Sequence, residues 1–135
     1  MAKPAAKPLT VYYDASCPMC ASEMRVLREA AGADGLELID CSSPRFDPSV
    51  CAAEGVTREA MMTKLHARDA SGRWLVALDA YEAVYRAAGY GRIARLWGSR
   101  LLRPVLDPVY AVIARHRNSI SRLGVHSIIG RMLRR

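Results

Sequence analysis

The stretch Val11-Tyr-Tyr-Asp-Ala-Ser-Cys-Pro-Met-Cys20 joins an apolar run to the start of a helical pattern and carries two cysteines three positions apart. The run Leu9–Tyr13 is rich in β-prone residues and predicts a strand that is buried on both faces of a sheet. Pro18 suits the first position of a helix, where a missing N–H costs nothing. After it, apolar residues recur at helical spacing, at Cys20, Met24, Leu27 and Ala31.

Short strands and helices alternate through the rest of the first ninety residues. We expect a second strand at 36–41, a short helix at 57–62, a β-hairpin with strands at 64–69 and 74–78, and a helix at 79–88. Asp79 and Glu82 match a capping box for that last helix. Strands alternating with helices and closed by a hairpin predict an α/β fold of the thioredoxin-like kind, a small mixed sheet flanked by helices.

The chain of 135 residues is long enough for one compact domain with a core. We expect a flexible N-terminal segment at 1–8, a thioredoxin-like domain at 9–90 and a basic helical extension at 91–135. In the extension, Asp107-Pro108 has the composition of a cap and first position for a helix. Residues 125–133 form a final apolar stripe.

Charge is distributed unevenly along the chain. Residues 1–85 carry 9 Lys and Arg against 12 Asp and Glu, a net charge of −3, whereas residues 86–135 carry 11 Arg against the single acid Asp107, a net charge of +10. Such an extension is either a solvated helical face or a surface that contacts an acidic partner or a membrane. Its arginines alternate with aliphatic rather than aromatic residues, so nucleic acid is not an expected partner.

The sequence offers neither a secretory signal nor a membrane span. The first eight residues lack an apolar segment, and no window approaches the roughly 18 consecutive apolar residues that a span needs. We therefore expect a cytoplasmic protein, in which most thiols are kept reduced. Four cysteines in that setting favour catalysis or metal binding over a disulfide framework.

The pair Cys17 and Cys20 has three open interpretations: a redox centre, half of a metal site, or packing. For redox chemistry, a helix N-terminus favours the thiolate through its free N–H groups and its dipole. We expect Cys17 to lie at this end, to be exposed and to attack a disulfide. Cys20 lies one turn later, within reach of Cys17, and heads the apolar stripe, so we expect it to be half-buried and to resolve the mixed disulfide.

Asp14 precedes Cys17 by three residues and has two possible effects. A nearby ionised carboxylate would disfavour the Cys17 thiolate, whereas a buried one could accept the proton of Cys20 during resolution. We favour the second role. The alternative is that Asp14 only stabilises the turn through hydrogen bonds.

The two other cysteines allow a metal interpretation. Cys17, Cys20, Cys41 and Cys51 together supply the four thiolates of a structural zinc site, but the ten-residue gap in the second pair is not a typical ligand spacing. Cys41 and Cys51 could also form a second redox pair. Cys41 ends a predicted strand, however, and we expect an ordinary buried cysteine there. We assign no metal ligand and no cofactor.

The motif Tyr13-Asp14-x-x-Cys17-Pro18-x-Cys20 resembles the signature of the DCC family of thiol-disulfide oxidoreductases. The stretches Leu65–Trp74, Leu78–Tyr81, Arg103–Tyr110 and Ile113–Arg117 are similar to the hairpin, helix start and C-terminal helix of that family. The resemblance covers roughly residues 9–122 and implies a thioredoxin-like fold. It carries redox roles onto Asp14, Cys17 and Cys20.

The functional hypothesis is therefore a thiol-disulfide oxidoreductase with a Cys-Pro-Met-Cys centre. Its substrates would be disulfides of proteins or small thiols, coupled to a thiol system that supplies or accepts electrons. The alternative is a non-catalytic thioredoxin-like module that docks a protein partner or a membrane surface through its basic C-terminal helices.

Overall fold

Four strands form one mixed sheet in the computed structural model, which describes residues 8–122 and 131. Their order in the sheet is β2-β1-β3-β4. β1 pairs with β2 in parallel, and the pairs β1–β3 and β3–β4 are antiparallel. The strands are β1 (Leu9–Tyr13), β2 (Leu36–Asp40), β3 (His66–Arg68) and β4 (Trp74–Val76).

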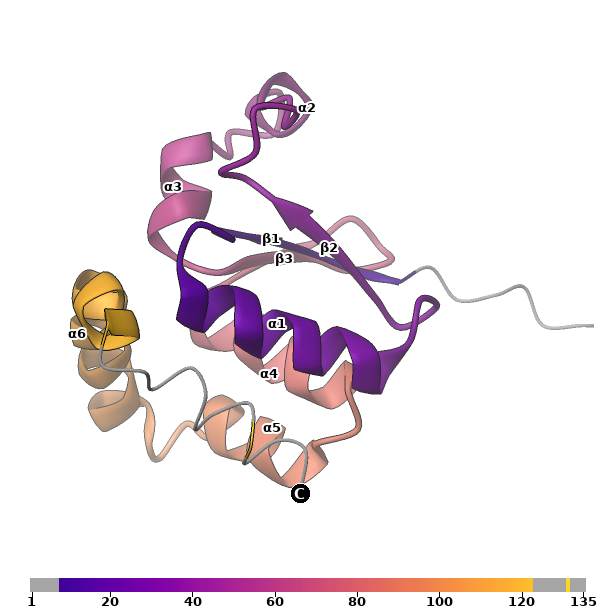
Figure 1. Ribbon diagram of the computed structural model, residues 1–135. Helices are drawn as coiled ribbons and strands as arrows, with labels where there is room; N and C mark the ends of the chain where they lie inside the picture. The colour runs from indigo at the N-terminus through magenta and orange to yellow at the C-terminus, as the bar shows by residue number, and fades with distance from the viewer. Residues whose placement is uncertain (1–7, 123–130, 132–135) are drawn as a thin grey trace, which may run out of the picture.

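Helices cover both faces of this sheet, as Figure 1 shows. Those in the described part of the chain are α1 (Pro18–Ala31), α2 (Ser49–Ala52), α3 (Arg58–Thr63), α4 (Leu78–Ala87), α5 (Gly91–Gly98) and α6 (Arg103–Arg122). α1 and α4 lie side by side on one face, and α2 and α3 lie on the other. α5 packs against α4 on the side away from the sheet. The arrangement is α/β and consistent with a thioredoxin-like fold, as predicted.

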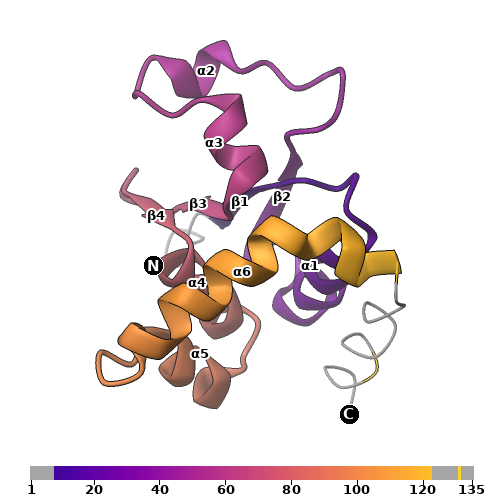
Figure 2. The same cartoon turned by 90° about the vertical axis from the view of Figure 1, so that its left-hand side faces the viewer.

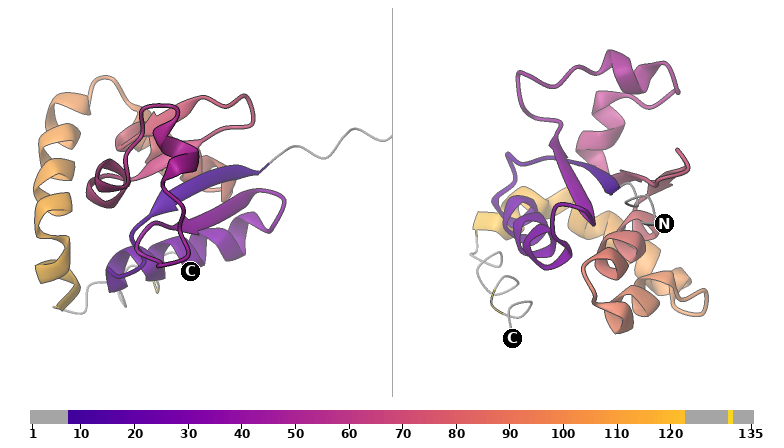
Figure 3. Two further views of the ribbon diagram at one scale, coloured as in Figure 1. Left: turned by 90° about the horizontal axis from the view of Figure 1, so that it is seen from above. Right: turned by 90° about the vertical axis from the view of Figure 1, so that its right-hand side faces the viewer.

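α6 runs across the end of these layers rather than along the sheet. In Figure 2 it passes from the end of α5 across α4 to α1, and the top view in Figure 3 shows it along one side of the molecule. It contacts both α1 and α5. The end of α1 that lies beside α6 is its N-terminus, where the chain enters from β1. This placement brings a distant part of the sequence to the cysteine pair.

β1 separates two apolar clusters. Val11 faces the larger one, with Met24 and Leu27 of α1, whereas Tyr12 faces a smaller one that contains Cys41 and Met61. Successive side chains of a strand point to opposite faces, so a strand buried on both faces needs an unbroken apolar run. The expectation for Leu9–Tyr13 is confirmed at Val11 and Tyr12, both of which are buried.

The predicted starts of two helices, at Asp79 and at Asp107-Pro108, are wrong. α4 begins at Leu78 without a side-chain cap, because the chain already turns at Ala77, whose φ of 56° is positive. Asp79 instead accepts a hydrogen bond from Arg103. α6 begins at Arg103, so that Pro108 lies inside it, although a proline cannot donate the helical N–H bond.

Several expectations concern residues that the structure does not describe. The proposed segment 1–8 lies outside the described residues except for Pro8, and the final apolar stripe at 125–133 lies outside them except for Arg131. The division into 9–90 and 91–135 stays a prediction. Within the described part of the chain, no helix combines the length and apolar character needed to cross a membrane.

Leu27 offers a test of the larger cluster. Its side chain is fully buried between α1 and the sheet, so Leu27→Ala should leave a cavity and lower the free energy of unfolding by about 2–5 kcal/mol. Leu101→Ala is the matched control, because Leu101 is 91% exposed and should change stability by less than about 0.5 kcal/mol. Urea unfolding measures both, and equal effects would contradict this assignment of the core.

Candidate active site

Cys17 caps α1. Its backbone is extended, with φ −85° and ψ 112°, and Pro18 takes the first helical position, as predicted. The Cys20 N–H donates a hydrogen bond to the Cys17 Sγ at 3.4 Å. The Cys20 thiol also donates to that sulfur, and the two sulfur atoms are 2.8 Å apart. Both cysteines are reduced. The first turn of the helix therefore holds the two thiols in contact, with two donors directed at Cys17.

The predicted exposure of Cys17 is wrong, whereas the prediction of a half-buried Cys20 is confirmed. The side chain of Cys17 has none of its surface exposed, whereas Cys20 is half-buried. Capping alone does not bury a side chain, because Thr57 caps α3 in the same way and is exposed. The burial of Cys17 therefore depends on the elements packed around it. Cys20 points instead into the space between α1 and α6, where it lines a cavity that does not include Cys17.

Asp14 lies in the turn that connects β1 to α1 and is also buried. Its carboxylate accepts hydrogen bonds from the N–H and the hydroxyl of Ser16. The same turn is tied to β2, because Asp40 accepts a hydrogen bond from the Ala15 N–H at 3.0 Å. Asp14 thus stabilises the turn and lines the cavity together with Cys20. The structure brings together all three residues that the sequence singled out.

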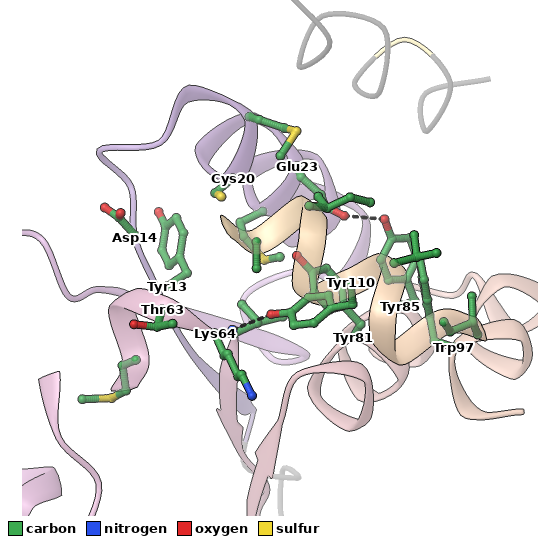
Figure 4. Close-up of a pocket in the computed structure, with 18 of the residues that line it drawn as sticks. Tyr13, Asp14, Cys20, Glu23, Thr63, Lys64, Tyr81, Tyr85, Trp97 and Tyr110 are labelled. Atoms are coloured by element: carbon green, nitrogen blue, oxygen red, sulfur yellow. Dashed lines mark hydrogen bonds between the residues drawn. The ribbon is translucent and has the colours of Figure 1, made fainter. Parts of the chain in front are cut away.

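The cavity beside Cys20 has a volume of about 350 Å³. α6 closes one side of it, and Figure 4 shows Asp14 and Tyr13 at one end with Glu23 and Tyr85 toward the other. Most of the wall is aromatic or aliphatic. The described residues that line it are Tyr13, Asp14, Met19, Cys20, Glu23, Met24, Met61, Thr63, Lys64, Leu65, Tyr81, Tyr85, Ile93, Trp97, Leu106, Val109, Tyr110, Ile113 and Ala114.

Glu23 is the site residue that the sequence did not single out. It is buried one turn after Cys20, on the same side of α1, and the Tyr85 hydroxyl donates a hydrogen bond of 2.6 Å to its carboxyl group. Burial raises the pKa of Glu23, and the hydrogen bond from Tyr85 opposes part of that rise. The sequence did contain a signal for Glu23, because it places an acid three residues after Cys20 on the buried side of a predicted helix.

Cys41 and Cys51 lie in a different environment. Both are buried in the smaller apolar cluster with Tyr12 and Met61, on the opposite face of the sheet from α1. Burial is the main cause that raises the pKa of Cys41 to about 12, so its thiol is protonated at neutral pH. The expectation of an ordinary buried cysteine at Cys41 is confirmed. Among the residues that the structure describes, no group of three or more His, Cys, Asp or Glu side chains could hold a metal ion.

Comparison with known proteins agrees with this geometry. Residues 11–123 match the family described as DCC1-like thiol-disulfide oxidoreductase. The chain belongs to this family. The match runs from β1 beyond the end of α6, so the helix that closes the cavity is part of the family's pattern as well as the cysteine pair.

The chain also resembles a plant protein. The chain is 25% identical over 120 residues to an uncharacterized chloroplastic protein of Arabidopsis thaliana. The matched region covers 88% of this chain but only 55% of the relative, so the chain spans about half the length of that protein. No solved structure matches the chain.

The raised pKa of Glu23 predicts a pH-dependent stability. A carboxyl whose pKa is higher in the folded than in the unfolded state stabilises the fold fully below the unfolded value, near 4.3, and less as pH rises through the folded value. Glu23→Gln removes this loss and keeps an oxygen that can accept the Tyr85 hydrogen bond. We expect the unfolding free energy of the variant, relative to the parent, to increase from pH 4 to pH 8.

Chemical unfolding at several pH values measures this difference. The matched control is Glu29→Gln, because Glu29 lies on the same helix but is exposed. Parallel pH profiles for the parent and the Glu23→Gln variant would show that the Glu23 carboxyl is not held in its uncharged form by the fold.

Proposed function

We propose that the protein exchanges thiols and disulfides through the Cys17–Cys20 pair. The contact of the two sulfurs, with Cys17 Sγ accepting the Cys20 N–H at the N-terminus of α1, supports this function best. Hydrogen bonds and the positive end of a helix of 14 residues both favour a thiolate at that position. Membership of the thiol-disulfide oxidoreductase family agrees with this chemistry.

The exchange takes two steps. The Cys17 thiolate attacks one sulfur of a substrate disulfide, forms a mixed disulfide and releases the first substrate thiolate. Cys20 loses its proton, attacks the Cys17 Sγ and releases the second thiolate. The protein gives up two electrons, which the substrate disulfide accepts. Because Cys17 is buried and Cys20 lines the cavity, the substrate sulfur must reach Cys17 from the cavity, with the Cys20 side chain turned aside.

Asp14 is the proposed proton acceptor for Cys20. The carboxylate is buried, lines the same cavity and is held in place by Ser16. A base at this position acts in the second step, when the Cys20 thiol must become a nucleophile. Glu23 lies on the other side of Cys20 along the cavity and is the competing candidate.

The cellular setting is also part of the proposal. We place the protein in the cytoplasm, a reducing compartment in which the buried thiols and the Cys17–Cys20 pair would be kept reduced. The Arabidopsis relative is named as chloroplastic, and a chloroplast location is therefore the alternative. The partner would be a thiol system that restores the pair after each cycle.

The alternative function, a docking module, is favoured by the outer side of α6. Val105 and Val112 are exposed there, and Arg115 is exposed farther along the helix. A peripheral membrane surface or an acidic protein would suit such a helix. This function requires no reactivity at Cys17 and Cys20, so a disulfide-exchange assay decides between the two functions.

Substitution of single cysteines tests the exchange reaction. Cys17→Ser should abolish the oxidation of the reduced protein by a disulfide, whereas Cys20→Ser should stop at a stable mixed disulfide on Cys17. Mass spectrometry identifies the cysteine that carries the adduct. Cys41→Ala is the matched control and should leave exchange unchanged, because its thiol stays protonated.

The outcomes separate the hypotheses. An adduct on Cys20 in the Cys17→Ser variant would reverse the roles of the two thiols. If the pair cannot be cycled between dithiol and disulfide, the oxidoreductase function is contradicted. The docking function then remains.

Asp14→Asn tests the proton acceptor. The amide oxygen can still accept hydrogen bonds from Ser16, so the turn should persist, but the amide cannot take up the Cys20 proton. We expect the second thiolate to leave about 100-fold more slowly, with accumulation of the mixed disulfide, while the first step is preserved. Rapid quenching and mass spectrometry follow both steps. If Glu23→Gln produces this effect and Asp14→Asn does not, Glu23 is the acceptor.

A further inference from the structure

We infer that the cavity between α1 and α6 is the substrate subsite, and that it accepts the uncharged apolar group next to the sulfur of a disulfide. This inference rests on the proposed exchange reaction and adds the class of substrate. The protein would then react poorly with disulfides whose neighbouring groups are anionic, including the disulfide of glutathione.

Position supports this assignment first. Of the two reactive thiols, only Cys20 lines the cavity, and its sulfur is in contact with that of Cys17. A substrate sulfur placed next to the pair from this side therefore carries its attached group into the cavity. At about 350 Å³ the space is near the small end of the range for ligand sites, which suits one side chain or a small molecule.

The chemistry of the wall supports it second. α1 contributes Met19 and Met24, and α6 contributes Leu106, Val109 and Ile113. Aromatic rings complete the lining; among them, Tyr81 lies 5.6 Å from Tyr110, centroid to centroid, in an edge-to-face arrangement. Methionine and aromatic side chains adapt well to apolar groups of varied shape.

The charges in the wall support it third. Asp14 and Glu23 are both acids, and Lys64 is the one cation among the described lining residues. The Lys64 residue is exposed rather than enclosed. A substrate with several carboxylates would lose hydration without gaining enough cationic partners, and its charge would be repelled by an ionised Asp14. An uncharged apolar group meets neither cost.

The experiment compares symmetric dipeptide disulfides with the same reacting sulfur. The pair is acetyl-Phe-Cys-amide and acetyl-Glu-Cys-amide, each oxidised to its disulfide. The reduced protein is mixed with each one, and the release of peptide thiol is followed. We expect the Phe disulfide to react about 10- to 100-fold faster, after division by its rate with free cysteine, because burial of an aromatic side chain favours it.

A pair of lysine variants locates the preference. Val109 lines the cavity and is 47% exposed, whereas Val112 lies on the same helix, is 57% exposed and does not line it. Val109→Lys should reduce the Phe-to-Glu rate ratio by about threefold or more, because the new cation attracts Glu. Val112→Lys should leave the ratio unchanged. A ratio near one in the parent, or equal changes in both variants, would overturn the inference.

Two further measurements keep the inference separate from the exchange reaction. In the double variant Cys17→Ser/Cys20→Ser, which cannot react, the neutral dye Nile red should still bind and should bind more weakly after Val109→Lys. Exchange without the Phe preference would overturn the subsite alone. Dye binding in a protein that exchanges no disulfide would overturn the proposed function alone.

The apolar group could belong to a polypeptide or to a small molecule, and the length of the peptide substrate distinguishes these two sources. Phe-Cys disulfides extended on both sides by glycine and serine residues should keep the preference for Phe in either case. An unchanged rate would identify a polypeptide disulfide as the substrate, and a much lower rate would identify a small molecule that fits under α6.

Discussion

The hydrogen bond from the Cys20 N–H to the Cys17 Sγ connects the fold of this protein to its chemistry. A helix needs a partner for the free N–H groups of its first turn, and serine, threonine, aspartate and asparagine usually supply one. Here the sulfur of Cys17 does so. The atom that satisfies the backbone is therefore also the proposed nucleophile. Substituting Cys17 alters the cap and the reactive group together, which is why a conservative serine is the informative replacement.

The surroundings of this cap limit the directions from which the proposed substrate could approach. The β1–α1 turn is held by Asp14 from within and by Asp40 from the neighbouring strand, so Cys17 is enclosed on that side. α6 crosses the end of the layers and contacts α1. The space that remains beside the pair is the cavity at Cys20, and its apolar wall is shared between the α/β layers and the C-terminal helix. Through α6, residues more than eighty positions away in sequence contribute to the site.

Local sequence patterns predicted the elements on which the site depends. The apolar run of β1, Pro18 at the first helical position and Cys17 as cap are all properties of neighbouring residues, and the structure contains each of them. The burial of Cys17 depends instead on how the turn and the neighbouring elements pack around it. Helical periodicity gave the direction of Cys20 relative to its own helix but contained no information on α6. The same limit applies to Glu23, because the pattern of α1 places it on the buried side of the helix but cannot reveal its hydrogen bond with Tyr85 of α4.

The two acids of the cavity differ in a way that matters for proton transfer. Asp14 accepts hydrogen bonds from the N–H and the hydroxyl of Ser16, a donor in its own turn. Glu23 has the Tyr85 hydroxyl as a hydrogen-bond donor and is deeply buried, which favours its protonated form. The proton acceptor of a thiol must begin the step ionised, and this requirement disfavours Glu23. Whenever Glu23 is protonated, it carries no negative charge and does not repel a thiolate formed on Cys20 during the proposed resolution step.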